Sequence, residues 1–306
     1  RLKDRTVALL FFNPSMRTRT SFTAGADQTG GMALVLEPGK GAWPIAFEDG
    51  LRMDGEEEEH VAEVARVLSR YVDIIAVRAF PKFKDWQEDR LDAVVNAFAQ
   101  HATVPVINME TITHPCQELA LIMALQKHLG GTDGKKFVLT WTYHPKPLNT
   151  AVANSALIIA AKFGFNVTLL APTPEYRLDE RYMAAAEKDA KAQGRSVTFT
   201  TNIQEAYTGA EFVYAKSWGA LPYFGNWDAE KPMREANRHF MVDMEKMALT
   251  PNARFSHCLP VRRNVKVTDA VLDSPRAIHI DEAENRLHVQ KALLAHLVGQ
   301  VPRKGG

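Results

Sequence analysis

Short apolar runs rich in β-branched residues alternate with segments of helical periodicity along most of the chain. The runs predict strands at 6–12, 32–37, 74–80, 104–109, 136–143, 166–171, 196–201, 211–218, 254–259 and 277–280. Helical periodicity predicts helices over 58–71, 151–163, 180–192 and 282–298. Strands that are apolar throughout and separated by helices are typical of parallel sheets covered on both faces. The pattern therefore predicts an α/β fold of the doubly wound type.

The number of predicted strands favours two parallel sheets over one. Residues 128–136 are rich in glycine and charge and are the best candidate for a linker. The last predicted helix follows the final strand and is expected to return to the first domain. We therefore expect one domain over residues 1–125 plus 283–306, and a second over residues 126–282.

Composition indicates a soluble globular protein, because 46% of the 306 residues are apolar and 24% are charged. A net charge of +1 argues against nucleic acid or a membrane surface as a general partner. No apolar run reaches the roughly 18–20 residues of a membrane span. The opening residues do not form a signal peptide, and two cysteines give no disulfide framework. We expect a cytoplasmic location.

Several polar segments follow predicted strands, where ligands bind in folds of this type. The segment 11–20, FFNPSMRTRT, can start a helix capped by Ser15 or Asn13. The free N–H groups of such a helix attract an anion, and Arg17 and Arg19 add positive charge. A capped helix with solvated arginines remains the alternative. Arg78 ends a second strand, where it is either a ligand-binding or a salt-bridged arginine.

Two further polar segments point to a small-molecule site. In the segment 110–117, ETITHPCQ, His114 and Gln117 flank a proline, although a lone histidine is more often structural. The segment 255–264, FSHCLPVRRN, contains Cys258, which is more often a buried residue than a nucleophile because nothing local lowers its pKa. No carboxylate cluster suggests a metal. Hydroxyls, arginines, a histidine and a glutamine at strand ends suit a phosphorylated, carbonyl-bearing molecule.

Three of these motifs resemble, in the same order, those of the aspartate/ornithine carbamoyltransferases. The family's S-T-R-T-R, H-P-x-Q and H-C-L-P correspond here to S-M-R-T-R at 15–19, H-P-C-Q at 114–117 and H-C-L-P at 257–260. The resemblance covers essentially the whole chain, apart from the N-terminal helix usual in the family. It implies a homotrimer with shared active sites and a two-domain fold, in which residues 1–125 plus 283–306 bind carbamoyl phosphate and residues 126–282 bind an acylated ornithine. It also implies a reaction in which an amine attacks the carbonyl carbon of carbamoyl phosphate and phosphate leaves, without cofactor or metal.

The resemblance assigns carbamoyl phosphate to a set of residues spread over the chain. Within this set Thr18, Arg78 and His114 polarise the carbonyl, and Trp43 reaches in from a neighbouring subunit. Without the resemblance, Trp43 would be interpreted as a packed loop aromatic. Thr23 departs from the family, which usually has a glutamate there, and this leaves the local ion pairing open. The full set is Ser15, Met16, Arg17, Thr18, Trp43, Arg78, His114, Gln117, Cys258, Leu259 and Arg286.

A departure from the ornithine enzymes bears on the amine that is carbamoylated. Those enzymes carry D-x-x-x-S-M-G, whose aspartate binds the α-ammonium of ornithine, whereas Val213 stands in that place here. Lys216 adds a cation that would repel an α-ammonium but can pair with an α-carboxylate. A solvated lysine at a strand end is the alternative. The chain resembles the subgroup acting on N-acetylornithine, which assigns that substrate to Glu110, His144, Lys216 and Leu259.

The acyl group is the second point of specificity. In the resemblance, Glu58 reaches the acyl pocket of an adjacent subunit, where enzymes acting on N-succinylornithine have a proline. A carboxylate there would repel succinyl but not acetyl, although acidic residues also simply suit a helix N-terminus. We expect transfer of a carbamoyl group to N-acetylornithine, giving N-acetylcitrulline in arginine biosynthesis. Succinylornithine, plain ornithine and a non-catalytic ligand-binding role are the alternatives, and intact Arg17, Arg78, His114 and Gln117 argue against the last.

Lys266 carries one further hypothesis. It follows Arg262 and Arg263, whose charges are expected to lower its pKa and favour the neutral amine. A neutral lysine can take up CO₂, and the resulting carbamate can pair with those arginines. An ordinary loop lysine is the alternative.

Overall fold

The computed structural model describes residues 2–301, which fold into two compact units. Unit 1 contains residues up to Lys82, Gln87–Cys116 and the segment from Arg286 onward, and unit 2 contains Phe83–Trp86 and Gln117–Asn285. Among the helices of residues 2–301, none combines the length and apolar character of a membrane span. The assignment of separate binding roles to residues 1–125 plus 283–306 and to 126–282 stays a prediction.

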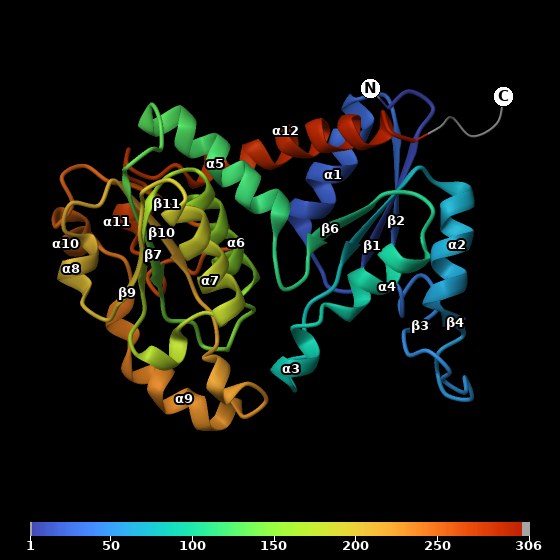
Figure 1. Ribbon diagram of the computed structural model, residues 1–306, viewed down its shortest axis with the longest axis horizontal. Coiled ribbons are helices and arrows are strands. Elements are labelled where there is room, and N and C mark those ends of the chain that lie inside the picture. The colour runs from blue at the N-terminus through green and yellow to red at the C-terminus, as the bar shows by residue number, and fades with distance from the viewer. Residues whose placement is uncertain (1, 302–306) are drawn as a thin grey trace. The chain divides into compact units, whose positions relative to one another are not determined.

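Unit 1 is built on a parallel sheet of four strands in the order β2-β1-β5-β6. Figure 1 shows helices α1 and α2 on opposite sides of this sheet. A two-stranded ladder, β3 with β4, precedes α2. The elements are β1 (Thr6–Phe11), α1 (Met16–Gln28), β2 (Met32–Leu36), β3 (Ile45–Ala46), β4 (Glu59–His60), α2 (Val61–Tyr71), β5 (Ile74–Arg78), α3 (Trp86–Asp89, its first residue in unit 2), α4 (Ala93–His101) and β6 (Val106–Glu110).

Successive residues of β1 pack into two different cores, as the period of two in a strand requires. Val7 and Leu9 belong to a cluster with residues of α1 and of the last helix. Ala8 and Leu10 belong to a cluster with residues of α2 and α4. The strand is apolar throughout because both of its faces are covered, which confirms the doubly wound interpretation for this unit.

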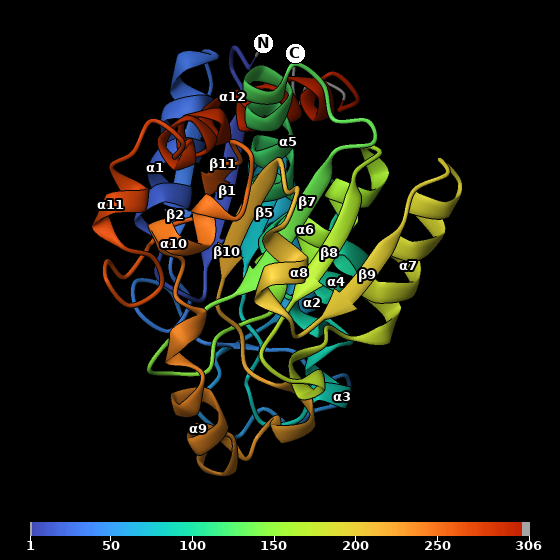
Figure 2. The same ribbon diagram turned by 90° about the vertical axis from the view of Figure 1, so that its left-hand side faces the viewer.

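Unit 2 contains a parallel sheet of five strands in the order β11-β10-β7-β8-β9. Figure 2 shows β10, β7, β8 and β9 side by side. The elements are α5 (Pro115–Leu129, its first two residues in unit 1), β7 (Lys136–Trp141), α6 (Ala151–Lys162), β8 (Asn166–Leu170), η1 (Pro174–Tyr176), α7 (Glu180–Lys191), β9 (Val197–Thr200), α8 (Ile203–Tyr207), β10 (Phe212–Lys216), η2 (Leu221–Tyr223), α9 (Trp227–Ala236), η3 (Arg238–Phe240), α10 (Met244–Ala248), β11 (Arg254–Ser256), α11 (Asp269–Leu272) and α12 (His279–Val298), which continues into unit 1.

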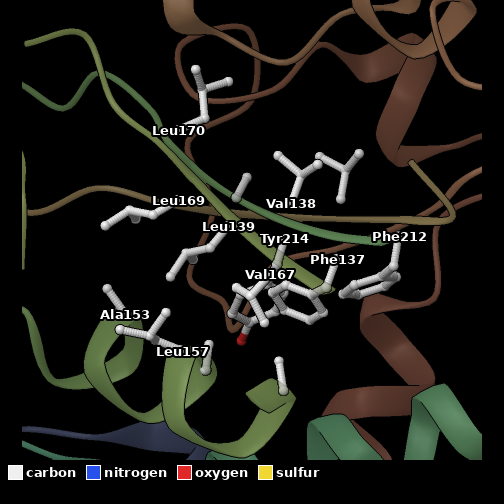
Figure 3. Packing of buried hydrophobic residues seen from close by; sticks show 14 of the residues in the cluster. Phe137, Val138, Leu139, Ala153, Leu157, Val167, Leu169, Leu170, Phe212 and Tyr214 are labelled. Carbon is white, nitrogen blue, oxygen red and sulfur yellow. The ribbon is translucent and has the colours of Figure 1, made fainter. Parts of the chain in front are cut away.

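The core of unit 2 lies between this sheet and its helices. Figure 3 shows Ala153 and Leu157 of α6 beside the strand residues Leu139 and Val167, while Val138 lies on the other face of the sheet. Burial of these side chains is the main stabilising contribution to the unit, at roughly 25 cal/mol for each Å² of apolar surface removed from water.

The structure corrects two of the sequence expectations. Residues 277–280 do not form a strand: Ala277 makes a single bridge to Phe255, and α12 begins at His279. The helix expected from residue 58 begins at Val61, because Glu59 and His60 pair with β3 instead. The other predicted strands are present, each within a few residues of its expected ends.

Candidate active site

The strand ends of unit 1 bring three segments of the candidate site into one row. Phe11 pairs with Arg78 and Arg78 with Glu110, each at or next to the carboxyl end of its strand. The chain runs outward from β1 to β2 on one side and to β5 on the other, so β1 and β5 flank the switch point of this sheet. Ligands bind beyond the carboxyl ends of strands at such points.

The segment after β1 starts helix α1 as the sequence predicts. Ser15 is the N-cap, and its hydroxyl accepts a hydrogen bond from Thr18 N at 3.2 Å. Asn13 does not cap the helix; its Oδ1 accepts from Phe80 N at 2.6 Å and ties this loop to the one after β5. The first-turn N–H groups and the helix dipole favour an anion at this end.

The predicted arginines of α1 differ in their surroundings. Arg17 is half-buried, whereas Arg19 is exposed and lies 3.3 Å from Glu37 in an ion pair. Met16 is 76% exposed, so its side chain lies outside the core of the unit. Arg17 is therefore the better placed of the two arginines to add charge beside the buried part of the helix start.

Five predicted side chains meet in one buried network in unit 1. Arg286 Nη2 donates to Thr18 Oγ1 at 3.1 Å, and Arg286 Nη1 lies 3.4 Å from His114 Nε2. Glu110 Oε2 lies 3.3 Å from the same His114 nitrogen and accepts a hydrogen bond from Arg78. Arg78, which is buried, and Glu110, which is partly buried, form an ion pair, which satisfies charges that would otherwise be costly away from water. The structure thus joins residues predicted for the phosphorylated substrate to one predicted for the amine substrate.

The loop that carries His114 is fixed by side chains of its own unit. Thr111 Oγ1 donates to Asp92 Oδ2 at 2.7 Å and accepts from Asn108 Nδ2 at 2.7 Å. Thr111 N donates to Thr113 O at 2.9 Å. These bonds hold the backbone between β6 and α5, so the direction in which His114 leaves the loop is set locally.

In unit 2, the predicted substrate residues also meet at a switch point. The chain runs from β7 toward β8 on one side and β10 lies on the other, with Trp141 paired to Lys216. His144 follows β7, and Lys216 ends β10. Val213, in the place of the ornithine enzymes' aspartate, is fully buried in β10.

His144 is buried and neutral at physiological pH. Burial is the largest cause that lowers its pKa, to about 4, and the charges of Lys266, Arg262 and Lys216 lower it further. Arg262 Nε donates to His144 Nε2 at 3.1 Å, so Nε2 accepts a hydrogen bond. Nδ1 in turn lies 2.8 Å from Lys146 O. The site thus presents several cations around a ring that carries no charge.

Lys266 is part of the same cationic group and is only 3% exposed. Burial first, and then the charges of Lys216 and Arg262, lower its pKa from 10.5 to about 7. The expectation that Arg263 shares in this effect is wrong, because its guanidinium turns to the surface and pairs with Asp269 and Asp273 at 2.8 Å.

The H-C-L-P segment follows β11 and has a constrained backbone. Leu259 adopts a φ of 58°, a left-handed conformation that is unusual for a bulky residue. Its N–H donates to His257 Nδ1 at 2.8 Å, which supports that conformation. Cys258 is buried beside Lys266. Backbone outliers of this kind concentrate at functional sites.

Three other predicted residues lie elsewhere in their units. Gln117 is in the first turn of α5, and its amide nitrogen donates to Glu282. Trp43 is 65% exposed, and Glu58 is also exposed, both on segments of unit 1 that precede α2. Within residues 2–301, no three His, Cys, Asp or Glu side chains gather in a way suited to a metal ion, and the expectation of no cofactor stays a prediction.

Two residues of these networks were not predicted as site residues. The sequence points to Arg262 only as a neighbour of Lys266 and a partner for its carbamate, although its place beside the H-C-L-P motif is a signal. Glu282 precedes Arg286 by one helical turn, so it leaves the same face of α12. The sequence shows this spacing of four residues, but the helix contains many other charged residues, so nothing in its sequence pattern marks Glu282 as buried.

The sequence and fold match one family over most of the chain. Residues 1–127 match the aspartate/ornithine carbamoyltransferase carbamoyl-P binding domain, and residues 139–297 match the Asp/Orn binding domain of the same family. A protein of Xanthomonas campestris pv. campestris named N-acetylornithine carbamoyltransferase is 67% identical over 301 residues, which are 98% of this chain and 89% of that protein. A protein of Bacteroides fragilis named N-succinylornithine carbamoyltransferase is 37% identical over 304 residues, covering 98% and 89%.

A solved structure agrees with these matches. The crystal structure of acetylornithine transcarbamylase complexed with acetylcitrulline has a TM-score of 0.97 and 65% identity, covering 99% of this chain and 90% of that chain. The family domains, the high identity and the switch-point networks all lead to one conclusion: the chain belongs to the aspartate/ornithine carbamoyltransferase family.

Proposed function

We propose that the protein transfers the carbamoyl group of carbamoyl phosphate to the δ-amine of N-acetyl-L-ornithine, giving N-acetyl-L-citrulline and phosphate. The observation that carries the proposal is the network in which Thr18, His114 and Arg286 meet at the switch point of unit 1. Relatives at 65–67% identity, named N-acetylornithine carbamoyltransferase, support the choice of amine. The reaction is a step of arginine biosynthesis.

The phosphate group is proposed to bind at the start of α1. A dianion there would accept hydrogen bonds from the backbone N–H groups of the first turn, next to the Ser15 cap. Arg17 and Arg286 would supply positive charge, and the Thr18 hydroxyl a further donor. Met16 would contribute through its backbone, since its side chain is exposed.

The carbonyl group is proposed to be polarised by Thr18, Arg78 and His114. When the δ-amine attacks the carbonyl carbon, negative charge develops on the carbonyl oxygen and then on the departing phosphate. A C–N bond forms, the bond between the carbonyl carbon and the bridging phosphate oxygen breaks, and the proton that the amine loses passes to the departing phosphate. Donors held in place before the reaction stabilise this charge without reorganising. Gln117, Arg286 and the backbone at Cys258 and Leu259 would hold the carbamoyl end.

The amine substrate is proposed to bind through Glu110, His144, Lys216 and Leu259. The α-carboxylate of an acylated ornithine suits the cations around His144, and Arg262 joins this group. The neutral acyl-amide nitrogen needs no aspartate, which agrees with the buried Val213. A free α-ammonium would meet like charges, at about 4 kcal/mol for each pair 4 Å apart in an effective dielectric of 20.

Glu58 is proposed to select acetyl over succinyl by repelling a second carboxylate. Replacing Glu58 by proline or alanine should raise turnover of N-succinylornithine relative to N-acetylornithine. The neighbouring Glu57→Ala variant is a matched control that leaves Glu58 in place. If the Glu58 variants keep the original preference, this residue is not the selector.

Lys266 is proposed to accept CO₂ as a carbamate. Its neutral amine adds to CO₂, an N–C bond forms, and one proton is released. The lowered pKa favours the neutral amine, and Arg262 would pair with the new negative charge. Mass spectrometry under native conditions should find an added 44 Da (about the mass of CO₂) that the Lys266→Arg variant lacks. An unmodified lysine in bicarbonate buffer would contradict this proposal.

A homotrimer with shared active sites is proposed, in a cytoplasmic protein. Large apolar side chains are exposed on unit 1, which supports burial against other copies; they include Met32, Leu34, Trp43, Leu51 and Tyr71. Sedimentation should give a particle of three chains. If Trp43 serves the neighbouring site, mixing inactive Arg17→Ala and Trp43→Ala subunits should restore part of the activity, and mixtures as inactive as each variant would refute sharing.

The function is tested by offering carbamoyl phosphate with ornithine, N-acetylornithine or N-succinylornithine in parallel assays. We expect citrulline-type product predominantly from N-acetylornithine. The Arg78→Ala variant should lose most of this turnover, whereas Arg19→Ala, at an exposed arginine of α1, should retain most of it. Product from none of the three amines, despite binding of carbamoyl phosphate, would instead support a non-catalytic role.

A further inference from the structure

Glu282 in the first turn of α12 is a fully buried carboxylate, with 0% of its surface exposed. Three side chains of unit 2 donate hydrogen bonds to it. The Gln117 amide nitrogen and the Tyr214 hydroxyl, the latter at 2.8 Å, reach Oε1. The Ser256 hydroxyl reaches Oε2. The carboxylate thus joins the starts of α5 and α12 to the strands β10 and β11.

The bond from Gln117 has a direction, because the two ends of an amide differ. The nitrogen is only a donor and the oxygen only an acceptor, whereas carboxylate oxygens accept. With its nitrogen facing Glu282, Gln117 must present its carbonyl oxygen on the opposite side of the amide. Rotating the amide by half a turn would place its oxygen against a carboxylate oxygen and leave a buried acceptor without a donor, which is costly.

We propose that Glu282 is a positioning residue that fixes the Gln117 amide with its oxygen toward the substrate. This inference rests on the proposed function, in which Gln117 holds the carbamoyl end of carbamoyl phosphate. The carbamoyl group carries an NH₂, which needs an acceptor. A fixed amide oxygen accepts from that NH₂, while a freely rotating amide would present its own NH₂ for part of the time.

The same device gives selectivity among acyl phosphates. Acetyl phosphate has a methyl group where carbamoyl phosphate has its NH₂, and a methyl group gives the Gln117 oxygen no hydrogen bond. A site that places a polar acceptor there leaves it unpaired when the wrong ligand binds. Glu282 therefore acts on the preference for carbamoyl phosphate, and not on phosphate binding.

The test compares the dissociation constants of carbamoyl phosphate and acetyl phosphate for the wild type and Glu282→Gln. Glutamine can either accept or donate, so it no longer dictates the orientation of Gln117. Carbamoyl phosphate should bind about tenfold more weakly to the variant, the value of roughly one hydrogen bond. Acetyl phosphate should change by less than about twofold. Equal weakening of both ligands, or of neither, would overturn the proposal.

Tyr214→Phe is the matched control, because it removes another donor to the same carboxylate oxygen but keeps the bond from Gln117. It should leave the ratio of the two dissociation constants unchanged. Gln117→Ala should lose the same selectivity, and adding Glu282→Gln to it should lower the ratio no further. An additional loss in the double variant would show that Glu282 acts by another route, and would refute the inference.

Failure of the proposed function has a different signature. A wild type that does not bind carbamoyl phosphate at all refutes the function itself. A wild type that binds it with selectivity, while Glu282→Gln keeps that selectivity, refutes only the positioning role. If Glu282→Gln does not fold, hydrogen exchange in the wild type tests the proposal instead. The NMR signals of the Gln117 side-chain NH₂ can be assigned by their loss in Gln117→Ala. These hydrogens should exchange slowly with solvent, and rapid exchange would overturn the proposal.

Discussion

Replacing Lys266 by methionine should change how stability depends on pH. The lysine is almost fully buried, and burial together with Lys216 and Arg262 lowers its pKa from 10.5 to about 7. Methionine has a similar length, is apolar and does not titrate. The variant therefore removes one titrating group while the volume of the site is nearly preserved.

The sign follows from the number of protons bound in each state. Between pH 7 and 10.5, the folded state holds Lys266 largely neutral while the unfolded chain holds it protonated. The unfolded state thus binds more protons, and stability rises with pH across this window. A pKa difference of one unit corresponds to 1.36 kcal/mol, so the difference between the unfolded pKa of 10.5 and the folded pKa of about 7 changes the free energy of unfolding by about 5 kcal/mol at most. Below pH 7 and above pH 10.5 the contribution is flat.

The assay is urea unfolding of wild type and Lys266→Met at several pH values from 6 to 10, in buffer free of CO₂. Subtracting the two free energies of unfolding cancels the titration of the groups that do not interact with Lys266. The difference, wild type minus variant, should increase by a few kcal/mol from pH 7 to pH 10. A difference that stays constant would show that Lys266 titrates normally, and the account of this cationic group would be wrong.

Bicarbonate adds a second arm to the same experiment. If the folded state takes up CO₂ on Lys266, added bicarbonate should stabilise the wild type at pH 8, because a ligand that binds only the folded state shifts the equilibrium toward it. Lys266→Met should not respond. Stabilisation of both proteins by the same amount would be a salt effect and would count against the carbamate.

Three further predictions concern the packing of the units. Gly225→Ala should lower the free energy of unfolding by about 2–4 kcal/mol, because Gly225 has a φ of +85° and an added Cβ would lie 2.1 Å from Lys84 O. Gly209→Ala is the control: its φ is +72° but the space around it is open, so the loss should be only about 1 kcal/mol. Equal losses in urea unfolding would refute the close approach at Gly225. Burial raises the pKa of Glu118 to about 7, so the folded state holds a proton that the unfolded state has lost, and the wild type should lose stability as the pH rises from 4.5 to about 7. Glu118→Gln should abolish this loss. Parallel plots of unfolding free energy against pH for the two proteins would contradict this. Gln290→Met should raise the melting temperature. Neither polar atom of this fully buried amide has a hydrogen-bond partner within residues 2–301, and each unpaired atom destabilises the fold by about 1–3 kcal/mol. A lower melting temperature would show that the amide is hydrogen-bonded in solution.

The sequence was a good guide to the sheets because their strands are apolar on both faces. Runs such as 74–78 and 137–141 are buried along their whole length, so periodicity and composition agree. The strand prediction at 277–280 was wrong because the apolar stretch there is short. Ala277 and Ile278 extend only far enough to reach Phe255 before α12 begins, and two residues cannot distinguish a bridge from a strand.

The candidate site was predictable in its residue types and less so in its connections. Ser15, Arg78 and His114 lie in motifs at strand ends, and the parallel sheet necessarily gathers such ends at one edge. The sequence gives no sign that Glu110 pairs with Arg78, or that Arg263 turns away from Lys266, because these depend on side-chain directions in loops. Residues that act through others, such as Glu282, carry no motif of their own.

The charges of the two units suit different substrates. In unit 1 the cations Arg78 and Arg286 share a network with one carboxylate, Glu110, so the local charge stays positive at the start of α1 and suits a dianion. In unit 2 the cations Lys216, Arg262 and Lys266 surround a histidine that burial keeps neutral. Under the proposed function, this second group attracts the α-carboxylate and repels an α-ammonium. Under the same proposal, discrimination against ornithine would be spread over several cations, and the valine in place of the aspartate at position 213 would be only one part of it.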